Sequence, residues 1–370
     1  MDIITLVNQS VVVYISIQSM LVSFRQHVKC LFKSKIQQVW ETGVNSMSNQ
    51  FLISRLLLFI LVSVILVIII QDVGYARRKG YIYFSERDKI KRMKINGSDV
   101  QEILTDVGWV RDIALDMSNR KIYWVTPPRI YRANLDGSKI EMIVDKVAPN
   151  KPPREAANNP FSIALDIEAN KVYWGNNVPW GIRSVNNDGS NIEHIEMERN
   201  VLLPFSVDAE SLELDARDGK LYFADSFNGT IARANVDGSN HEHLGISMMD
   251  AWGLALDLHN RRMYWTQVVT GIIRSASFDG KDKTTILTDL VNPGDIALDM
   301  YSQEMYWVEK GIVKQKPGRI RRSNFDGSNV TDIFNGSKFI YEIALDIDRF
   351  YDVKPTTEKL TTTWANVKNH

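Results

Sequence analysis

Six aspartates recur at the ends of short apolar runs, and they are the residues of this sequence best placed to do chemistry together. Each closes a run of the type Ile-Ala-Leu-Asp: Asp116, Asp166, Asp215, Asp257, Asp299 and Asp346. Carboxylates gathered from several strands can hold Ca²⁺ or Mg²⁺, so one hypothesis is a ring of metal ligands. The other is structural, because a carboxylate just before a turn accepts backbone N–H bonds. We favour the structural hypothesis and predict neither a metal nor a cofactor.

Other catalytic patterns are missing from the sequence. It has no Gly-rich phosphate loop, no His-Glu-x-x-His helix and no Gly-x-Ser-x-Gly elbow. Its single cysteine, Cys30, excludes a disulfide framework and a Cys-based zinc site. Lys plus Arg and Asp plus Glu both number 44, so net charge gives no argument for a nucleic-acid partner. We therefore predict a binding protein without catalytic residues.

Three marks recur between Tyr81 and Phe350. They are the apolar run ending in Asp, a Tyr followed by Phe or Trp, and a Gly preceded by Asp or once by Asn. The aromatic pairs begin at Tyr83, Tyr123, Tyr173, Tyr222, Tyr264 and Tyr306. The Asp of a run precedes the Tyr by seven residues wherever both are present. An Ile lies six residues before each of the six recurring Asp-Gly or Asn-Gly pairs, which begin at Asn96, Asp136, Asp188, Asp237, Asp279 and Asp326. Such constant spacing indicates one repeated structural unit.

Each unit is predicted to form four short strands. The unbroken apolar run suits an innermost strand that is buried on both faces, and the aromatic pair suits its neighbour. The Ile-containing strand follows, and Asp-Gly is expected to close a two-residue hairpin into the outer strand. Four antiparallel strands about every 45 residues make one blade of a β-propeller.

The two ends of the repeated region predict how the ring closes. The first unit begins near Tyr81 and has no apolar run before its aromatic strand, whereas the last run, Ile343–Asp346, has no aromatic pair after it. The last run is therefore expected to supply the inner strand of the first blade, which leaves no open sheet edge. The fold class is all-β, a six-bladed propeller preceded by an N-terminal hydrophobic helix.

The N-terminal helix is predicted from Phe51–Ile70, 20 residues with one charge, Arg55, which is long enough to cross a bilayer. It is either an uncleaved signal anchor of type II topology, or a signal peptide that starts at Met47 and is cleaved after Ala76. The length of the run favours the anchor. A weaker apolar run, Ile3 to Phe24, is a second span, an interfacial helix or untranslated sequence.

The chain is thus predicted to contain an extension (1–50), a signal-anchor or signal-peptide helix (51–75), the propeller (76–350) and a Thr-rich polar tail (351–370). Four sites in the propeller match the N-glycosylation pattern: Asn96, Asn228, Asn329 and Asn335. Together they favour an extracellular or lumenal propeller. We expect it to be membrane-anchored through Phe51–Ile70, or secreted if the helix is cleaved.

The repeated marks resemble the low-density lipoprotein receptor class B repeat, with its Tyr-Trp-Thr-Asp motif. The best copies are Asn134-Leu-Asp-Gly-Ser138 and Met263-Tyr-Trp-Thr266, and the resemblance covers residues 81–350. It implies an extracellular six-bladed propeller that binds a protein or peptide, with lipoproteins or Wnt-pathway components as partners, and that has no catalytic activity.

The last acid of that motif is poorly kept, since only Asp225 is an Asp. The resemblance implies that an Arg on the next strand pairs with this acid. Four units carry that Arg, as Arg92, Arg132, Arg233 and Arg322, while Ser184 and Ser275 replace it in the other two. We expect these ion pairs to be weak.

Binding residues are expected on the top face, where the loops after the aromatic strands meet the loops before the apolar runs. The candidate aromatic anchors there are Trp109, Trp180, Phe227 and Trp252. They either contact a ligand or plug the channel mouth. A basic stretch after Trp307 is either a solvated loop or a site for an acidic ligand: Lys310, Lys314, Lys316, Arg319, Arg321 and Arg322. His194, His241 and His243 fall on outer strands and are interpreted as surface residues rather than pH sensors.

Two functions follow from these patterns. The first is a non-catalytic, receptor-like, protein-binding propeller. The alternative is a propeller hydrolase or lactonase with a metal in the central channel. That alternative requires at least three carboxylate or Asn oxygens to converge from the inner strands.

Overall fold

The computed structural model describes residues 3–8, 11–16, 80–145, 159–177, 180–195, 197, 209–225, 228–247, 251–311, 316–336 and 339–347. The chain divides into two compact units, Met1–Arg78 and Lys79–His370. In the first unit, β1 (Ile3–Asn8) and β2 (Val11–Ser16) form an antiparallel hairpin in which Ile3 lies opposite Ser16. This part of the weaker apolar run therefore consists of strands and is not a helix.

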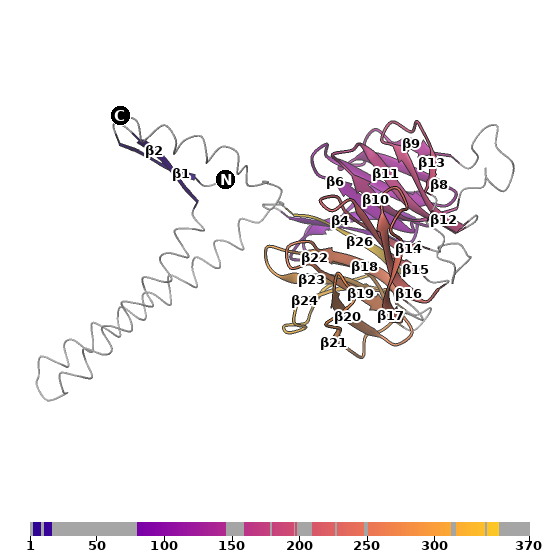
Figure 1. The fold of residues 1–370 in the computed structure, drawn as a ribbon. Coiled ribbons are helices and arrows are strands. Elements are labelled where there is room, and N and C mark those ends of the chain that lie inside the picture. Colours follow the sequence, from indigo (N-terminus) through magenta and orange to yellow (C-terminus); the bar gives the residue numbers. More distant parts are fainter. Residues whose placement is uncertain are drawn as a thin grey trace, which may run out of the picture. The chain divides into compact units, whose positions relative to one another are not determined.

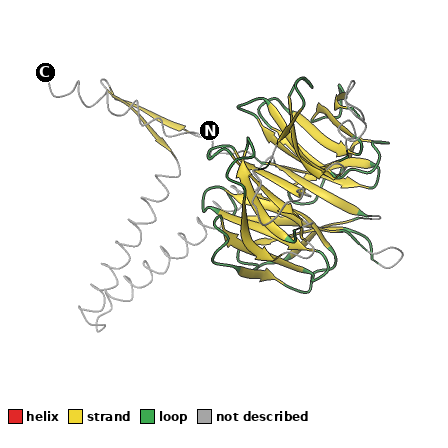
Figure 2. Ribbon diagram, turned by 45° about the vertical axis from the view of Figure 1, so that its right-hand side comes forward, coloured by secondary structure: helices red, strands yellow, loops and turns green. Residues whose placement is uncertain are grey.

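The predicted membrane helix at 51–75 and the polar tail at 351–370 lie outside the described residues. Within the described ranges, none of the secondary structure is a helix with the length and hydropathy that a membrane crossing requires. Figure 2 shows only strands and loops in this part of the chain.

Within the described residues, the second unit contains six four-stranded antiparallel sheets arranged as the blades of a propeller (Figure 1). Blades 2 to 6 each use four consecutive strands, ordered from the inner to the outer edge. Blade 2 contains β6 (Asp112–Asp116), β7 (Lys121–Thr126), β8 (Arg129–Asn134) and β9 (Glu141–Val144). Blade 3 contains β10 (Pro160–Asp166), β11 (Lys171–Asn177), β12 (Trp180–Asn186) and β13 (Glu193–Ile195).

The next three blades repeat this arrangement. Blade 4 contains β14 (Ala209–Asp215), β15 (Lys220–Asp225), β16 (Thr230–Asn235) and β17 (Glu242–Ser247). Blade 5 contains β18 (Ala251–Asp257), β19 (Arg262–Gln267), β20 (Ile272–Ser277) and β21 (Thr284–Leu287). Blade 6 contains β22 (Pro293–Asp299), β23 (Glu304–Glu309), β24 (Arg319–Asn324) and β25 (Thr331–Asn335).

Blade 1 joins the two ends of the repeated region, as the sequence predicts. Its inner strand is β26 (Ile340–Asp346), followed by β3 (Tyr81–Glu86), β4 (Lys89–Lys94) and β5 (Gln101–Leu104). The pairing of β26 with β3 places Asp346 opposite Tyr81 and Ile343 opposite Phe84. The ring is thus closed by hydrogen bonds between segments more than 250 residues apart, as in the bond from Glu342 N–H to Ser85 Oγ (3.1 Å, separation 257).

The hydrophobic core lies between the blades. Each of the six buried clusters combines aliphatic and aromatic side chains from two neighbouring sheets. In one of them Trp265 of blade 5, which is 1% exposed, is buried with Tyr222, Ile231 and Leu244 of blade 4. The repeated aromatic pairs are therefore the side chains that hold each blade against the next one.

Polar bonds from the repeated Tyr and Arg also join the blades. The Tyr83 hydroxyl donates to the carbonyl of Leu135 in blade 2 (3.2 Å), and the Tyr123 hydroxyl donates to Asn187 Oδ1 in blade 3 (2.5 Å). Arg233 of blade 4 donates to the carbonyl of Phe278 in blade 5 (3.0 Å). The receiving residue in each case directly precedes an Asp-Gly pair.

The expected pairing of the repeated Arg with the last acid of the motif is wrong. Arg132 and Arg233 form ion pairs with acids of the outermost strand, at 2.6 Å for Arg132 with Glu141 and 2.5 Å for Arg233 with Glu242. The physical reason is register: Arg132 lies opposite Tyr123, three residues before Thr126, which ends β7 at the position of the motif acid. The Arg side chain therefore points to the outer edge of the blade and to the next blade.

The expected two-residue Asp-Gly hairpin is also wrong. Residues 135–140 separate β8 from β9, so the connection is six residues long. Within it the Gly137 N–H donates to the Asn134 carbonyl (2.8 Å), and Asp136 Oδ1 accepts the Ser138 N–H (2.9 Å). Gly137 has a φ of +83°, and a Cβ there would lie 2.2 Å from the carbonyl oxygen of Ile103 in blade 1. The Gly is required because the turn packs against the preceding blade.

Candidate functional site at the channel mouth

The six inner-strand aspartates are structural, which confirms the favoured hypothesis where the turns are described. Asp116 Oδ1 accepts the backbone N–H of Asn119 (2.9 Å), and Asp257 Oδ1 accepts that of Asn260 (2.9 Å). The same turn bonds occur at Asp166, Asp215 and Asp299. Asp346 instead lies 3.6 Å from the Arg120 guanidinium. Five of the six carboxylates therefore hold their own turns.

A central channel of about 370 Å³ is lined by the inner strands of all six blades. The six inner strands begin at its top end, and the residue directly before each Ile-Ala-Leu-Asp run stands there. These residues are Glu342, Asp112, Ser162, Ser211, Gly253 and Asp295, in order from blade 1 to blade 6. A Cβ on Gly253 would lie 2.8 Å from the Cα of Asp295, so blade 5 has no room for a side chain at this position.

Several of these side chains bind the next blade. Asp112 accepts the N–H of Ile113 through Oδ1 (2.7 Å) and that of Ile163 in blade 3 through Oδ2 (2.7 Å). Asp295 accepts the N–H of Ile343 in blade 1 (3.1 Å) in the same way. Ser211 Oγ accepts the N–H of Leu254 in blade 5 (3.1 Å). The top of the channel is therefore ordered by hydrogen bonds that run around the ring.

Three carboxylates converge at this end of the channel. Asp112, Asp295 and Glu342 each offer an oxygen, and these oxygens all lie within 4.8 Å of one another. Burial raises the pKa of Asp295 to about 7 and raises the pKa of Asp112 and Glu342 well above the usual range, with mutual repulsion adding to the rise for the latter two. The convergence that the hydrolase alternative requires is thus present, but it is made by residues other than the six predicted aspartates.

Trp109 is the clearest aromatic candidate on the top face, because its side chain is 50% exposed. The Arg111 guanidinium lies 3.5 Å from the centroid of the Trp109 ring and 4.3 Å from that of Phe161, so it lies against both rings. The ring of Tyr341 lies 5.8 Å from that of Trp109. These neighbours fix the orientation of Trp109 while leaving half of it open to solvent.

The other three predicted anchors have different outcomes. Trp252 is half-buried, and the Lys310 ammonium lies 2.8 Å from the centroid of its ring. Trp180 begins β12, but the position of its side chain lies outside the description, and Phe227 lies outside the described residues altogether. Trp252 lies beside Glu342 and lowers the pKa of that carboxyl.

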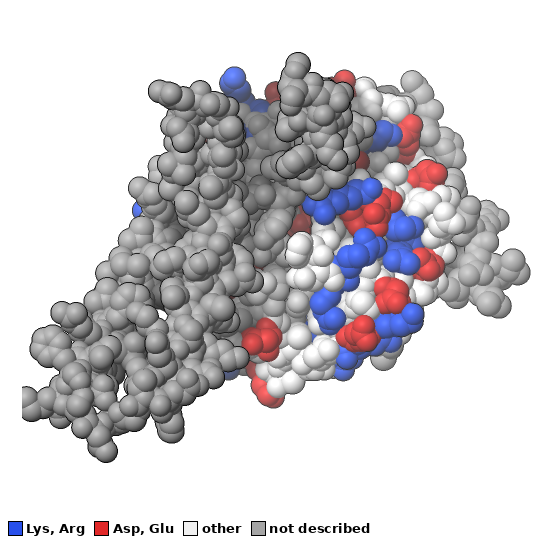
Figure 3. Space-filling model, turned by 60° about the vertical axis from the view of Figure 1, so that its left-hand side comes forward, with Lys and Arg blue, Asp and Glu red and all other residues white. Residues whose placement is uncertain are grey.

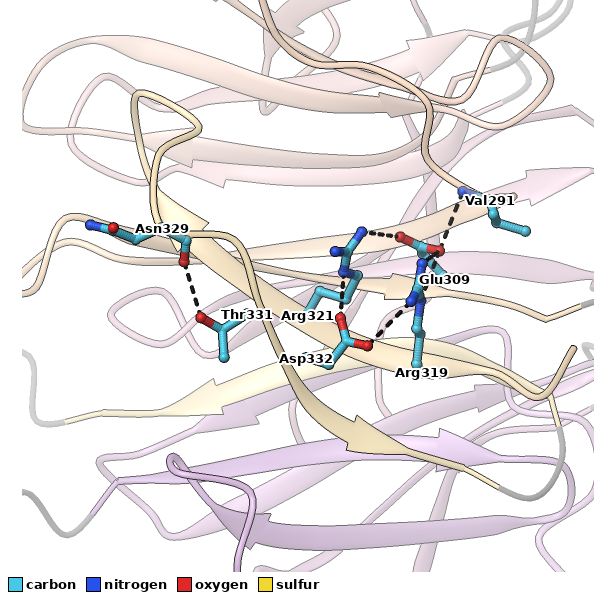
Figure 4. A network of polar contacts seen from close by, with 7 residues as sticks. All are labelled: Val291, Glu309, Arg319, Arg321, Asn329, Thr331 and Asp332. Carbon is cyan, nitrogen blue, oxygen red and sulfur yellow. Dashed lines mark hydrogen bonds and ion pairs between the residues drawn. The ribbon is translucent and has the colours of Figure 1, made fainter.

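The basic stretch after Trp307 is not an open cationic patch. Glu309, 2% exposed, accepts bonds from Arg319 Nη2 (2.8 Å) and Arg321 Nη1 (3.0 Å). Asp332 completes this network, at 2.8 Å from Arg321 Nε (Figure 4). Lys310 is buried, Arg322 lies 3.6 Å from Glu304, Lys316 is exposed, and Lys314 lies outside the described residues. The site for an acidic ligand is therefore not supported here, and the ion pairs of Glu309 are more buried than expected.

Charges elsewhere on the propeller are mixed. Acidic and basic side chains are interspersed on the face seen in Figure 3. The pKa of His241 is lowered by burial and by the nearby His243, whose ring centroid lies 5.0 Å away. His241 is therefore partly buried beside Phe223 and is not the plain surface residue that the sequence suggests.

The four glycosylation sites differ in accessibility. Asn96, Asn329 and Asn335 are exposed, and so is Thr331 of the Asn329 sequon. The Asn228 amide instead donates to the buried carboxylate of Asp225 (2.6 Å), and Thr230 is 9% exposed. Asn96 with Ser98, and Asn329 with Thr331, are thus sites at which the acceptor amide and the hydroxyl are both exposed.

Sequence reasoning missed Asp112, Asp295, Glu342 and Arg111. The signal was available for the acids, because three of the six inner-strand copies carry a carboxylate directly before Ile-Ala-Leu-Asp. The residue at that position differs among the six copies, so a pattern of repeated residues does not reveal it. Arg111 carries no local pattern, and only the folded structure shows the two rings against it.

Comparisons with known proteins agree with this architecture. The sequence model described as low-density lipoprotein receptor repeat class B matches residues 261–300, which contain β19, β20 and β21 of blade 5 and β22 of blade 6. A crystal structure of a nidogen–laminin complex is similar with a TM-score of 0.57 and 17% identity, over 72% of this chain and 98% of that one. TolB from Acinetobacter baumannii is similar with a TM-score of 0.57 and 11% identity, over 72% of this chain and 66% of that one. At these identities the similarity shows a shared fold.

Proposed function

Because the chain is a six-bladed propeller of the low-density lipoprotein receptor class B repeat type, we propose that it is a non-catalytic module that binds a protein or peptide on its top face. The observation that supports this most directly is Trp109, a half-exposed Trp held in place by Arg111. Large, oriented aromatic side chains are the residues that contribute most energy at protein interfaces. The nidogen–laminin structure offers an example of this fold in a protein complex.

The test is a partner search followed by one substitution. The full chain, expressed in a secretory cell, serves as bait for proximity labelling, and the captured protein is then titrated against purified variants. Trp109→Ala is expected to lower its affinity at least about thirtyfold, because truncation of a central interface aromatic costs about 2 kcal/mol or more. The stability of the variant should change by less than about 1 kcal/mol, since half of the side chain is already in water.

Tyr301→Ala is the matched control. Tyr301 is 48% exposed and follows the inner strand β22, so it lies at the opposite end of the channel. The Tyr301→Ala variant should bind the partner as the wild type does. If Tyr301→Ala abolishes binding while Trp109→Ala does not, the ligand docks on the other face and the proposed site is wrong.

A second candidate function is a hydrolase with a metal in the channel. One observation favours it, the convergence of Asp112, Asp295 and Glu342. Against catalysis, both aspartates hold backbone N–H groups of neighbouring blades, so the cluster has a structural role at the ring closure that requires no reaction. We therefore retain the binding function as the better supported one.

We further propose that the propeller is lumenal or extracellular, because several exposed sequons lie on it. Made in a secretory cell, the full chain should carry a glycan at Asn329, where the acceptor residues project into solvent. Digestion with an endoglycosidase should then shift the wild type by one glycan more than Asn329→Gln. Equal mobility of the two proteins before and after digestion would exclude Asn329, and no shift in either would contradict the lumenal location.

A further inference from the structure

The convergent carboxylates lie where the ring closes. Asp295 is on the inner strand of blade 6, Glu342 on that of blade 1 and Asp112 on that of blade 2, so three consecutive blades contribute one acid each. Blade 1 is the one that is assembled from the two ends of the repeated region. Three carboxylates whose oxygens approach within 4.8 Å repel one another strongly when ionised and buried, and they require either protons or a cation.

Within the described part of the chain this cluster has no ion pair, although the Lys310 ammonium lies near enough to lower the pKa of Asp295 and Glu342. None of the three acids forms an ion pair there. The Lys310 ammonium lies over the Trp252 ring, and no carboxylate oxygen of the described residues is within 4.0 Å of it, the limit for an ion pair. The backbone N–H groups bound by Asp112 and Asp295 occupy only some of the lone pairs of each carboxylate.

Glu342 gives the second, independent sign of a missing ligand. Its side chain is 3% exposed, and its Oε1 has no hydrogen-bond partner. Leaving a buried acceptor unsatisfied costs about 1–3 kcal/mol, and more for a charged one, so native structures rarely do so without a bound ion or water.

We propose that Asp112, Asp295 and Glu342 bind one Ca²⁺ ion, which links blades 6, 1 and 2 at the point where the propeller closes. All the ligand atoms are carboxylate oxygens, which suit a hard cation. At a metal–oxygen distance of about 2.3–2.6 Å, ligands on opposite sides of Ca²⁺ lie about 4.6–5.2 Å apart, whereas about 2.0–2.1 Å for Mg²⁺ gives about 4.0–4.2 Å. Oxygens that lie within 4.8 Å of one another can be spanned by a Ca²⁺ ion, which accepts irregular sets of oxygen ligands, whereas Mg²⁺ demands near-ideal octahedral geometry.

The surroundings leave room for such an ion. Asp112 and Asp295 line the channel of about 370 Å³, which has room for the waters that would complete the coordination of an ion.

The experiment uses the full chain and two readouts. Tb³⁺, a luminescent substitute for Ca²⁺, should be sensitised by excitation of Trp252 beside Glu342 and displaced by Ca²⁺ with an affinity on the order of 10⁻⁶–10⁻³ M. Thermal unfolding should shift to higher temperature with Ca²⁺ than with a chelator, because the ion binds only the folded ring.

Glu342→Gln keeps the size of the side chain and removes its charge, so it should weaken Ca²⁺ binding at least about tenfold. The matched control is Glu102→Gln, which makes the same change at an exposed carboxyl on β5 outside the cluster and should bind Ca²⁺ as the wild type does. A wild type whose Tb³⁺ signal and unfolding temperature do not respond to Ca²⁺ overturns the proposal and indicates a protonated cluster. An equal Ca²⁺ response in Glu342→Gln overturns it as well, because the ion then binds elsewhere.

Discussion

Deleting residues 340–370 is expected to leave a chain with no folded propeller. The deletion removes β26, the seven-residue inner strand of blade 1, and leaves β3 with an unpaired edge. It also removes Ile340 and Ile343, which are 0% and 3% exposed in the cluster between blades 6 and 1. Their burial alone contributes about 3–6 kcal/mol, against a net stability of about 5–15 kcal/mol for a whole domain. An opened ring would in addition expose the facing surfaces of two blades.

The control for this deletion is a chain shortened only by residues 351–370, which keeps all of β26. Circular dichroism, size-exclusion chromatography and limited proteolysis should show a cooperative melt and a compact, resistant core for the control. The deletion at 340 should show neither. A monomeric deletion variant that melts at the temperature of the control would mean that the ring does not depend on its closing strand.

The closure was predictable because it depends on residues that repeat. The spacing of seven residues from Asp to Tyr holds wherever both are present, so the absence of an aromatic pair after Asp346 is visible in the sequence. The structure confirms that Asp346 lies opposite Tyr81. The same regularity made the role of Asp116 and Asp257 predictable, because a carboxylate before a tight turn needs only its local neighbours to find hydrogen-bond donors.

The channel mouth could not be predicted in the same way, because its residues come from strands far apart in the sequence. Asp112 and Glu342 lie 230 positions apart by number, yet they stand on adjacent inner strands. They meet because the ring closes and because the residue before the apolar run, which differs from blade to blade, is an acid in both of these blades. The partners of Arg132 were missed for a related reason, since they depend on register and on the next blade rather than on the motif.

Trp265→Ala is expected to lower the free energy of unfolding by about 3–5 kcal/mol, the range for a fully buried Trp or Phe. Trp265 is 1% exposed and belongs to the cluster that joins blades 4 and 5, so its loss leaves a cavity between two blades. Trp265 lies opposite Leu254 on one neighbouring strand and Arg274 on the other. The hydrogen bonds to both strands fix the backbone, so the surrounding side chains cannot close the cavity by moving it. Equilibrium unfolding in urea measures the change.

Trp265→Phe separates the packing of the ring from its polar atom. The indole Nε1 of Trp265 is buried without a hydrogen-bond partner in the described residues, so replacing it by Phe removes an unsatisfied donor together with part of the ring. The loss of stability should then be about 1–2 kcal/mol, well below that of Ala. Trp109→Ala supplies the contrast at the surface, with little loss of stability and a large loss of binding. If Trp265→Ala unfolds at the same urea concentration as the wild type, the repeated aromatic side chains do not hold the blades together and the packing argument fails.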